Sequence, residues 1–581
     1  MNTLIISGGS GNDSLVKGIV KMYPEVNLKV LVNAYDNGKS TGVCRKVTNT
    51  LGVSDIRKNH YRMYKALYDI PNQNLIEFYE GRYDFTPGDE LKEVTQKLVF
   101  WGLEYLILYA ERFFARPESK NYTYKDFSVS NIIYSQMYSD HGYEETNRFF
   151  CQLLKLNDFV ILNSFDNVFI QAQTAQGKLI EDEGEIVEFA TKDDTITNIV
   201  YDNMPENVTT NPAAIQAVKD ADLIIISTGT FWASIYPTLQ YDDFYRYINE
   251  STARKIWILN NEEDKDAYGV TSNQMIHRFQ KLGLDLSDFI ILQNNDAVES
   301  LRQDNPDVNI CRFDMGNLKG GKHDPNALAT AIYKIYFGII NVEKYKKYIF
   351  DFDDTLWARP ANNSDIDKFN YLKSVDNLKL LNEVYKKGYN SVIVSGNSYH
   401  SISEKISYIY GGDLTDFKVP IWADANAVQI IGRNVVSWIP ELLMDTVKID
   451  NVVNILNDKY NISAIKNSDT FTTCVKIKPL SSFEQTLLAD YLNDYLLPKE
   501  GLDDCVARKT GRTTVDIVSK KNNKTTVMNQ FEEDPSTILY VGDEFDGGND
   551  ADISRVVANA IHVHDVYETN LLLRLLNEDK K

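Results

Sequence analysis

Short apolar runs alternate along the chain with longer amphipathic segments. Eight of these runs have the length and β-branched composition of a buried strand, and they cover residues 3–7, 28–34, 221–227, 254–260, 289–293, 347–353, 391–396 and 537–543. Strands that are apolar throughout and separated by helices are typical of parallel sheets covered on both faces. The pattern therefore predicts the α/β fold class, with Rossmann-like parallel sheets.

The pattern of strands and helices indicates a domain boundary near residue 345. There a helix containing residues 329–340 gives way to a new strand that is followed by aspartates. A chain of 581 residues is longer than a typical single domain, so separate cores are expected. We predict two units, at residues 1–345 and 346–581.

One apolar segment, residues 98–114, needs a separate interpretation. It is interrupted by Glu104 and Glu111 and is too short to span a bilayer comfortably. We predict a buried helix here and no membrane partner. Because no basic segment followed by a cleavable apolar stretch opens the chain, the expected compartment is the cytoplasm.

Charge narrows the range of partners. Lys and Arg total 61 against 82 Asp and Glu, a formal net charge of −21, which opposes binding to a polyanionic backbone. We expect no nucleic-acid partner, whereas small phosphorylated ligands remain compatible because local amides, lysines and metal ions hold them. A homo-oligomer stays an open alternative. The five cysteines lack metal-binding spacing and predict neither a zinc site nor a disulfide framework.

The strongest chemical signal is DFDDT at 351–355, directly after the apolar strand YIF. This places Asp351 at the carboxyl end of a strand, where ligands bind in open α/β sheets. Two carboxylates two residues apart, Asp351 and Asp353, can divide the work, one attacking phosphorus and the other handling the proton of the leaving group. Such a pair needs a cation, and Mg²⁺ prefers carboxylates together with water and phosphate oxygens.

Further ligands follow later apolar strands. Asp543 and Asp550 in GDEFDGGND are the first choices for metal ligands, with Asp546 as the competing carboxylate. Ser395 ends the strand of SVIVSG and suits a phosphoryl oxygen. Lys524 suits the balancing positive charge, although Lys520 and Lys521 lie close by. The simpler interpretation is an acidic turn after a buried strand, with the lysines on a solvated face.

The order of DxDxT, a serine at a strand end, a lysine and an acidic glycine loop resembles the haloacid dehalogenase superfamily over residues 347–581. The closing GDEFDGGNDADI looks most like its phosphomannomutase and sugar-phosphatase branch, which implies an α/β cap insertion at about 400–515. The resemblance implies catalytic roles for Asp351, Asp353, Ser395 and Lys524. It also implies Mg²⁺ as cofactor, and the predicted metal residues are Asp351, Asp353, Asp543 and Asp550.

The N-terminal half carries three polar glycine loops at strand ends, which should meet at one crevice. SGGSGNDS places a glycine turn before a helix, so that backbone amides could receive phosphate, although the same turn is also a common strand-to-helix connection. AYDNGKSTG and STGT follow the second and third of these strands, and SDIRKN lies between them. His323 and Asp324 in HDP could close this crevice, although HDP on a loop is more often a helix cap, and His323 is not assigned a catalytic role.

These loops, in this order, resemble the family of 2-phospho-lactate transferases and the related YvcK-like proteins that bind nucleotide sugars, over about residues 1–340. The resemblance implies a nucleotide or nucleotide-sugar site built from Gly9, Gly11, Asp36, Ser40, Asp55, Arg57, Thr228 and Gly229. Asn37 stands where the family has a second aspartate, and Lys39 replaces a glycine. Metal binding in this unit is therefore not assigned.

Two functions are compatible with this pair of units. The first is a bifunctional biosynthetic enzyme, in which the N-terminal unit transfers a phosphate-linked group from a nucleotide-activated donor. The C-terminal unit would then hydrolyse a phosphate ester through an aspartyl-phosphate, with Mg²⁺ present. The alternative is an N-terminal regulatory domain that only binds a nucleotide sugar, fused to a phosphatase or phosphomutase.

Overall fold

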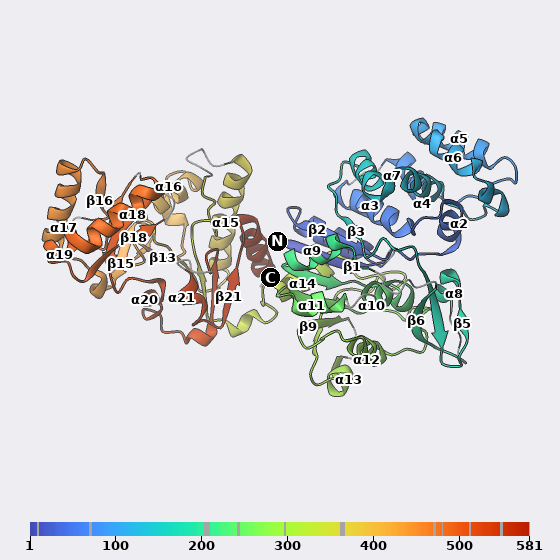
Figure 1. Cartoon of the computed structure of the whole chain (residues 1–581). Coiled ribbons are helices and arrows are strands. Elements are labelled where there is room, and N and C mark those ends of the chain that lie inside the picture. The colour runs from blue at the N-terminus through green and yellow to red at the C-terminus, as the bar shows by residue number, and fades with distance from the viewer. Residues whose placement is uncertain are drawn as a thin grey trace. The chain divides into compact units, whose positions relative to one another are not determined.

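The computed structural model describes most of the chain, in two compact units, Met1–Tyr336 and Phe337–Lys581 (Figure 1). The described residues are 1–8, 11–68, 72–189, 191, 193–202, 209–240, 244–294, 298–360, 367–468, 472–478, 480–510, 513–545 and 550–579. The division precedes the predicted boundary at 345, because the connecting segment packs on the second unit. There the Asn559 amide donates to the Phe337 carbonyl, and the Tyr345 hydroxyl donates to the Gly338 carbonyl.

Unit 1 is built on a seven-stranded sheet in the order β10-β9-β8-β7-β1-β2-β3, and every neighbouring pair is parallel. Its strands are β1 (Asn2–Ser7), β2 (Asn27–Val32), β3 (Val160–Leu162), β7 (Leu223–Ile226), β8 (Arg254–Ile258), β9 (Phe289–Gln293) and β10 (Asn309–Arg312). The apolar runs of the sequence form the buried strands, so the α/β prediction is confirmed.

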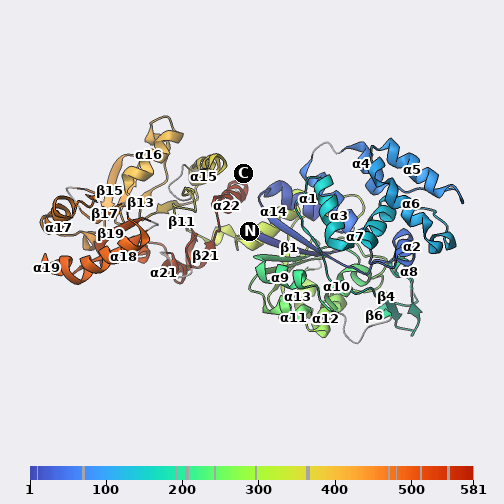
Figure 2. The same cartoon turned by 45° about the horizontal axis from the view of Figure 1, so that its top comes forward.

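Helices cover both faces of this sheet (Figure 2). On one face lie α1 (Asp13–Met22), α3 (Ser54–Leu67), α7 (Val129–Leu153) and α14 (Pro325–Tyr336). On the other lie α9 (Pro212–Asp220), α11 (Tyr245–Glu250), α12 (Ser272–Leu282) and α13 (Val298–Asp304). The chain order reverses between β1 and β7, and this reversal opens a crevice at the carboxyl ends of those strands.

Smaller elements surround the crevice side of unit 1. An antiparallel sheet has the order β5-β4-β6, from β4 (Phe169–Thr174), β5 (Leu179–Ile180) and β6 (Ile196–Asp202). The remaining helices are α2 (Lys39–Thr48), α4 (Gln73–Glu80), α5 (Glu90–Phe100), α6 (Ile107–Ala115), α8 (Glu183–Val187) and α10 (Tyr236–Gln240).

The prediction of one buried helix over residues 98–114 is wrong. Helix α5 ends at Phe100 and α6 begins at Ile107, because Gly102 adopts a positive φ of 73° that breaks the helix. Phe100 is 77% exposed, so the apolar segment is only partly buried. No helix in the described part of the chain is both long and apolar enough to cross a membrane.

Unit 2 has its own seven-stranded sheet in the order β15-β14-β13-β12-β11-β20-β21. Five strands run parallel, namely β11 (Lys347–Phe350), β12 (Ser391–Val394), β13 (Ile421–Ala423), β20 (Ile538–Gly542) and β21 (Asn559–His562). The hairpin of β14 (Val428–Ile431) and β15 (Asn434–Trp438) forms an antiparallel edge. The associated helices are α15 (Lys368–Lys386), α16 (Tyr399–Ile409), α20 (Lys524–Met528), α21 (Ala551–Ser554) and α22 (Val566–Asp579).

A separate antiparallel sheet, β16-β17-β19-β18, forms the cap of unit 2. Its elements are β16 (Ala464–Lys466), β17 (Cys474–Ile477), β18 (Cys505–Thr510), β19 (Thr514–Ser519), α17 (Thr446–Asn454), α18 (Ser482–Tyr491) and α19 (Leu497–Lys499). The predicted cap interval of 400–515 therefore begins too early. Residues 421–423 pair in parallel with β12, so this segment extends the core sheet instead.

Candidate functional site

The best-defined site lies at the carboxyl ends of the parallel strands of unit 2. Asp351 directly follows β11, Ser395 follows β12 and Asp543 follows β20. Asp550 precedes α21, and Lys524 is the first residue of α20. The sheet and two short helices thus bring together residues that are up to two hundred positions apart in sequence.

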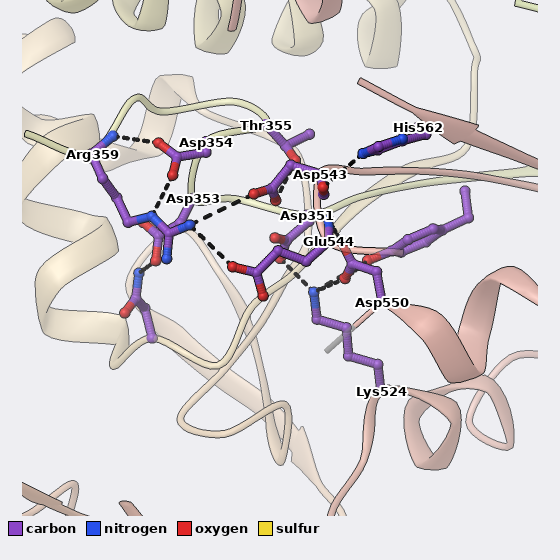
Figure 3. Close-up of polar contacts among 12 residues, drawn as sticks. Asp351, Asp353, Asp354, Thr355, Arg359, Lys524, Asp543, Glu544, Asp550 and His562 are labelled. Carbon is purple, nitrogen blue, oxygen red and sulfur yellow. Dashed lines mark hydrogen bonds and ion pairs between the residues drawn. The ribbon is translucent and has the colours of Figure 1, made fainter. Parts of the chain in front are cut away.

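A buried lysine links two of these carboxylates, as Figure 3 shows. The Lys524 ammonium lies 2.8 Å from Asp351 Oδ1 and also pairs with Asp550 Oδ1. The Tyr540 hydroxyl donates to the same Asp550 oxygen at 2.5 Å. Lys524 is 4% exposed, whereas Lys520 and Lys521 are exposed, so Lys524 is the lysine that lies in the site.

The charges in this cluster are strongly coupled. Burial raises the pKa of Asp351 to about 8, and the Asp550 carboxylate adds to that shift while Lys524 opposes it. Burial likewise raises the pKa of Asp543 to about 6, with Asp550 adding to it. One ammonium is thus insufficient to balance three closely spaced carboxylates.

The donor set fits a divalent cation. Asp351, Asp543 and Asp550 each offer a carboxylate oxygen, and these oxygens all lie within 4.8 Å of one another. Carboxylate oxygens are the ligands Mg²⁺ prefers. The competing Asp546 lies outside the described residues.

Asp353 was predicted both as acid/base and as metal residue, and its side chain lies apart from the three-carboxylate cluster. Its Oδ2 accepts a hydrogen bond from the Asn397 amide at 2.6 Å, and its Oδ1 lies 3.8 Å from the Lys405 ammonium. These contacts hold the Asp353 carboxylate apart from Lys524 (Figure 3). The placement suits proton transfer better than metal binding.

Arg359 also lies in this site, although the sequence motifs did not predict it. Its guanidinium donates to Asp354 Oδ2 and Glu544 Oε1 at 2.5 and 3.3 Å, and it lies 3.6 Å from Asp543 Oδ2. Asp354 adopts a positive φ of 51°, which turns the chain within the DFDDT segment. Nothing in the spacing of DFDDTLWARP distinguishes Arg359 from a surface arginine.

In unit 1, predicted residues line a cavity of about 250 Å³ beside α8. Asp36 and Asp55 contribute to this α8 cavity, together with Lys58, Arg82 and Glu183. Glu183 was not predicted as a site residue. It comes close in space because the small β5-β4-β6 sheet brings α8 over the crevice.

The other predicted residues of unit 1 hold the loops that form the crevice. Ser40 accepts hydrogen bonds from Arg82 and Asn131, at 2.9 and 2.8 Å. The Thr228 hydroxyl donates to the Gly11 carbonyl at 2.6 Å, and a Cβ at Gly11 would collide with the Thr228 backbone. Glycine is therefore required at position 11 for close approach of the two loops.

Arg57 lies away from the α8 cavity, because its guanidinium is buried and donates to the Tyr79 carbonyl. Arg82 supplies the arginine of that cavity instead. Gly9 lies outside the described residues. Asp324 accepts from the backbone amides of Asn326 and Ala327 at 3.0 and 2.9 Å, which confirms the interpretation of HDP as a helix cap.

A second cavity of about 280 Å³ lies at the ends of β7, β8 and β9. Gly229 lines it and exchanges two hydrogen bonds with the Asn260 side chain, at 3.1 and 3.0 Å. Phe231 and Met275 give the cavity apolar walls. Apolar walls with a few fixed amides are suited to a planar ring such as a nucleotide base.

Glu183 should make the stability of unit 1 depend on pH. Burial raises its pKa well above the ordinary value, and the Asp36 and Asp55 carboxylates add to the shift. Because the folded-state pKa lies above the unfolded value, ionisation destabilises the fold as pH rises. Glu183→Gln should therefore raise the melting temperature at pH 8 by about 2 °C or more.

That gain should shrink toward pH 5, because protonation of the wild-type carboxyl group removes its buried charge. Glu185→Gln, on the exposed side of the same helix, is the matched control and should show no such pH-dependent gain. Thermal melts at the two pH values measure both. An equal effect of the two substitutions would show that ionised Glu183 does not destabilise the fold more than the exposed Glu185 does.

The fold and the two sets of strand-end residues define a protein of two α/β units, each with polar side chains at the carboxyl ends of its parallel strands. The chain belongs to the 2-phospho-L-lactate transferase CofD family, whose model matches residues 3–320. This finding confirms the resemblance of the N-terminal unit.

Among similar curated proteins, a candidate gluconeogenesis factor of Aquifex aeolicus is 26% identical over 364 residues, covering 58% of this chain and 96% of that protein. The gluconeogenesis factor of Listeria innocua is 26% identical over 257 residues, covering 44% of this chain and 66% of its own length.

Solved structures are similar to each unit. A UPF0052-family protein of Bacillus halodurans covers 57% of this chain and 99% of its own, with a TM-score of 0.41 and 18% identity. For the C-terminal region, a trehalose-6-phosphate phosphatase related protein covers 40% of this chain and 97% of its own, with a TM-score of 0.29 and 15% identity. A haloacid dehalogenase-like hydrolase of Bacteroides thetaiotaomicron covers 39% and 92%, with a TM-score of 0.28 and 10% identity.

Proposed function

We propose that the C-terminal unit is a Mg²⁺-dependent phosphatase that hydrolyses phosphate monoesters through a phosphorylated Asp351. The observation that carries this proposal is the separation of two kinds of carboxylate at one cavity. Asp351 lies against Lys524 and two further carboxylates, whereas Asp353 lies against Asn397 and Lys405. Different surroundings suit the two aspartates to different roles.

In the first step an Asp351 oxygen attacks phosphorus and the bond from phosphorus to the ester oxygen breaks. Asp353 gives its proton to the departing oxygen. Ser395 is buried at the same cavity, and its hydroxyl is suited to hold a phosphoryl oxygen. The charge of Lys524 favours the anionic form of Asp351 and so opposes the effect of burial on its pKa.

In the second step water attacks the phosphorus of the aspartyl-phosphate, and Asp353, now a carboxylate, takes the proton of that water. Inorganic phosphate leaves and Asp351 is regenerated as a carboxylate. A Mg²⁺ ion held by Asp351, Asp543 and Asp550 would offset the repulsion between the anionic nucleophile and the anionic ester.

A phosphate-release assay on the full chain tests this proposal. With p-nitrophenyl phosphate as substrate, activity should require Mg²⁺ and should fall to background in excess chelator, because the three carboxylates would then repel the ester. Re-addition of Mg²⁺ should restore it. Unchanged turnover in chelator would reject the metal role of Asp543 and Asp550.

For the N-terminal unit we propose transfer of a phosphate-linked group from a nucleotide-activated donor. The family match and the two cavities at the strand ends support it. The alternative is a regulatory domain that binds a nucleotide sugar without turnover. The similarity to gluconeogenesis factors supports this alternative.

The full chain carrying Asp351→Asn separates these two functions, because phosphate release by the C-terminal unit is then removed. Nucleoside triphosphates and nucleotide sugars are offered, and released nucleotides are measured by chromatography. Release of nucleoside mono- or diphosphate rejects the purely regulatory domain. Tight binding in calorimetry without any release rejects the transferase.

A further inference from the structure

The cap sheet of unit 2 presents two chemically different faces. Val475, Ile477, Val515 and Ile517 belong to the apolar core of the cap. Because side chains alternate along a strand, the intervening positions point the other way. Those positions include Lys476 on β17 and Asp516 on β19, which are direct partners in the antiparallel register.

The outward face of the cap sheet closes the cavity of the proposed active site. This cavity of about 340 Å³ is lined by Asp351, Asp353 and Ser395 from the core. From the cap it is lined by Lys476, Lys478, Thr510, Thr513, Thr514 and Asp516. A phosphate ester bound with its phosphorus beside Asp351 would therefore place its organic group against the cap residues.

The described cap residues that line the cavity include two lysines and only one carboxylate, so their net charge is positive. The Lys476 ammonium lies 3.9 Å from Asp516 Oδ2, so Asp516 offsets one lysine. Lys478 is exposed, and its ammonium makes no ion pair or hydrogen bond with another described residue, whereas its backbone amide donates to the Ser463 carbonyl at 3.1 Å. Among the described residues that line this cavity, Arg359 is the remaining cation, and it is already paired with Asp354 and Glu544.

Asp516, which lines the same cavity, has a carboxylate oxygen that can accept a hydrogen bond from a ligand. It is 5% exposed, and within the described part of the chain its Oδ1 accepts no hydrogen bond. A buried carboxylate oxygen without a donor is costly. A hydroxyl group of a ligand in the cavity would satisfy it.

We propose that the C-terminal unit accepts phosphate monoesters whose organic part carries both a second anionic group and a hydroxyl group. Lys476 and Lys478 bind the second anion, a carboxylate or a second phosphate, and Asp516 accepts the hydroxyl. Phosphorylated hydroxy acids and polyol bisphosphates have this chemistry. The inference rests on the proposed phosphatase function, since it concerns the specificity of the same site.

The role of the lysines is tested by two substrates that differ in one anionic group, 6-phosphogluconate and glucitol 6-phosphate. The wild type should show a kcat/KM roughly tenfold higher for the acid, the size expected for hydrogen bonds to a charged group. In the double variant Lys476→Met/Lys478→Met this ratio should fall to about one. A ratio is measured because general damage to the protein lowers both rates together.

Lys509→Met is the matched control, because Lys509 lies on the opposite face of the same sheet and donates to Thr486 of α18. This variant should keep the wild-type ratio. An absent preference in the wild type, or one that survives in the double variant, overturns the role of the lysines. Failure of the wild type to hydrolyse p-nitrophenyl phosphate as well would instead reject the phosphatase itself.

The role of Asp516 is tested with 3-phosphoglycerate and 2-phosphoglycolate, of which only the first carries a hydroxyl group. Wild-type kcat/KM should favour 3-phosphoglycerate, and Asp516→Ala should reduce that ratio roughly tenfold. An unchanged ratio would remove Asp516 from the proposed subsite.

Discussion

Replacing Asp351 with asparagine is expected to abolish phosphate release by the C-terminal unit while leaving its fold intact. The substitution removes the anionic nucleophile and almost no volume. A loss of roughly 10³-fold or more in kcat is the size expected for removal of a nucleophile. The assay is steady-state phosphate release from p-nitrophenyl phosphate with Mg²⁺ present.

Asp354→Asn is a useful comparison, because Asp354 lies in the same DFDDT segment and pairs with Arg359. This variant should lose much less activity, since its carboxylate positions the loop and does not attack phosphorus. Both variants should melt cooperatively. Normal turnover by Asp351→Asn would reject the assignment of the nucleophile.

Replacing Lys524 with methionine should have the largest effect on stability. The lysine is buried between Asp351 and Asp550, and its loss leaves two buried carboxylates without their ammonium partner. Removing one member of a buried ion pair typically costs about 3–5 kcal/mol. We expect a loss of this order in the unfolding free energy of unit 2 at neutral pH, measured by denaturant titration.

Mg²⁺ should recover part of that loss, because a cation bound to the same carboxylates supplies positive charge. Lys521→Met is the matched control, since Lys521 is exposed three residues away in the same segment. It should change stability by no more than about 0.5 kcal/mol. Equal stability of the two variants would show that Lys524 does not hold the carboxylate cluster together.

Much of the parallel-strand framework could be predicted from the sequence, because strands buried on both faces form short, continuous apolar runs. The run at 289–293 coincides with β9, and the aspartates after the run at 347–350 lie at a strand end. The position of Asp351 directly after an apolar strand predicted it as a site residue, and the order of the motifs along the chain predicted Lys524. Both signals depend only on short segments.

Other site residues depend on contacts between segments far apart in the chain. Glu183 reaches Asp36 and Asp55 through the small sheet that carries α8, which no local pattern indicates. Lys476 faces the proposed active site only because the cap sheet lies over it. Its alternation with Val475 and Ile477 signals an amphipathic strand but does not indicate what the polar face meets.

The most direct test of the proposed phosphatase is to trap the covalent intermediate in the full chain carrying Asp353→Asn. An aryl phosphate has a good leaving group, so phosphorylation of Asp351 should proceed without a general acid, whereas hydrolysis of the aspartyl-phosphate should stall without the base. Mass spectrometry after rapid quenching should then find one phosphoryl group on the peptide that contains Asp351, and none in the double variant Asp351→Asn/Asp353→Asn. A phosphoryl group on another residue, or no covalent intermediate while phosphate is still released, would contradict the account.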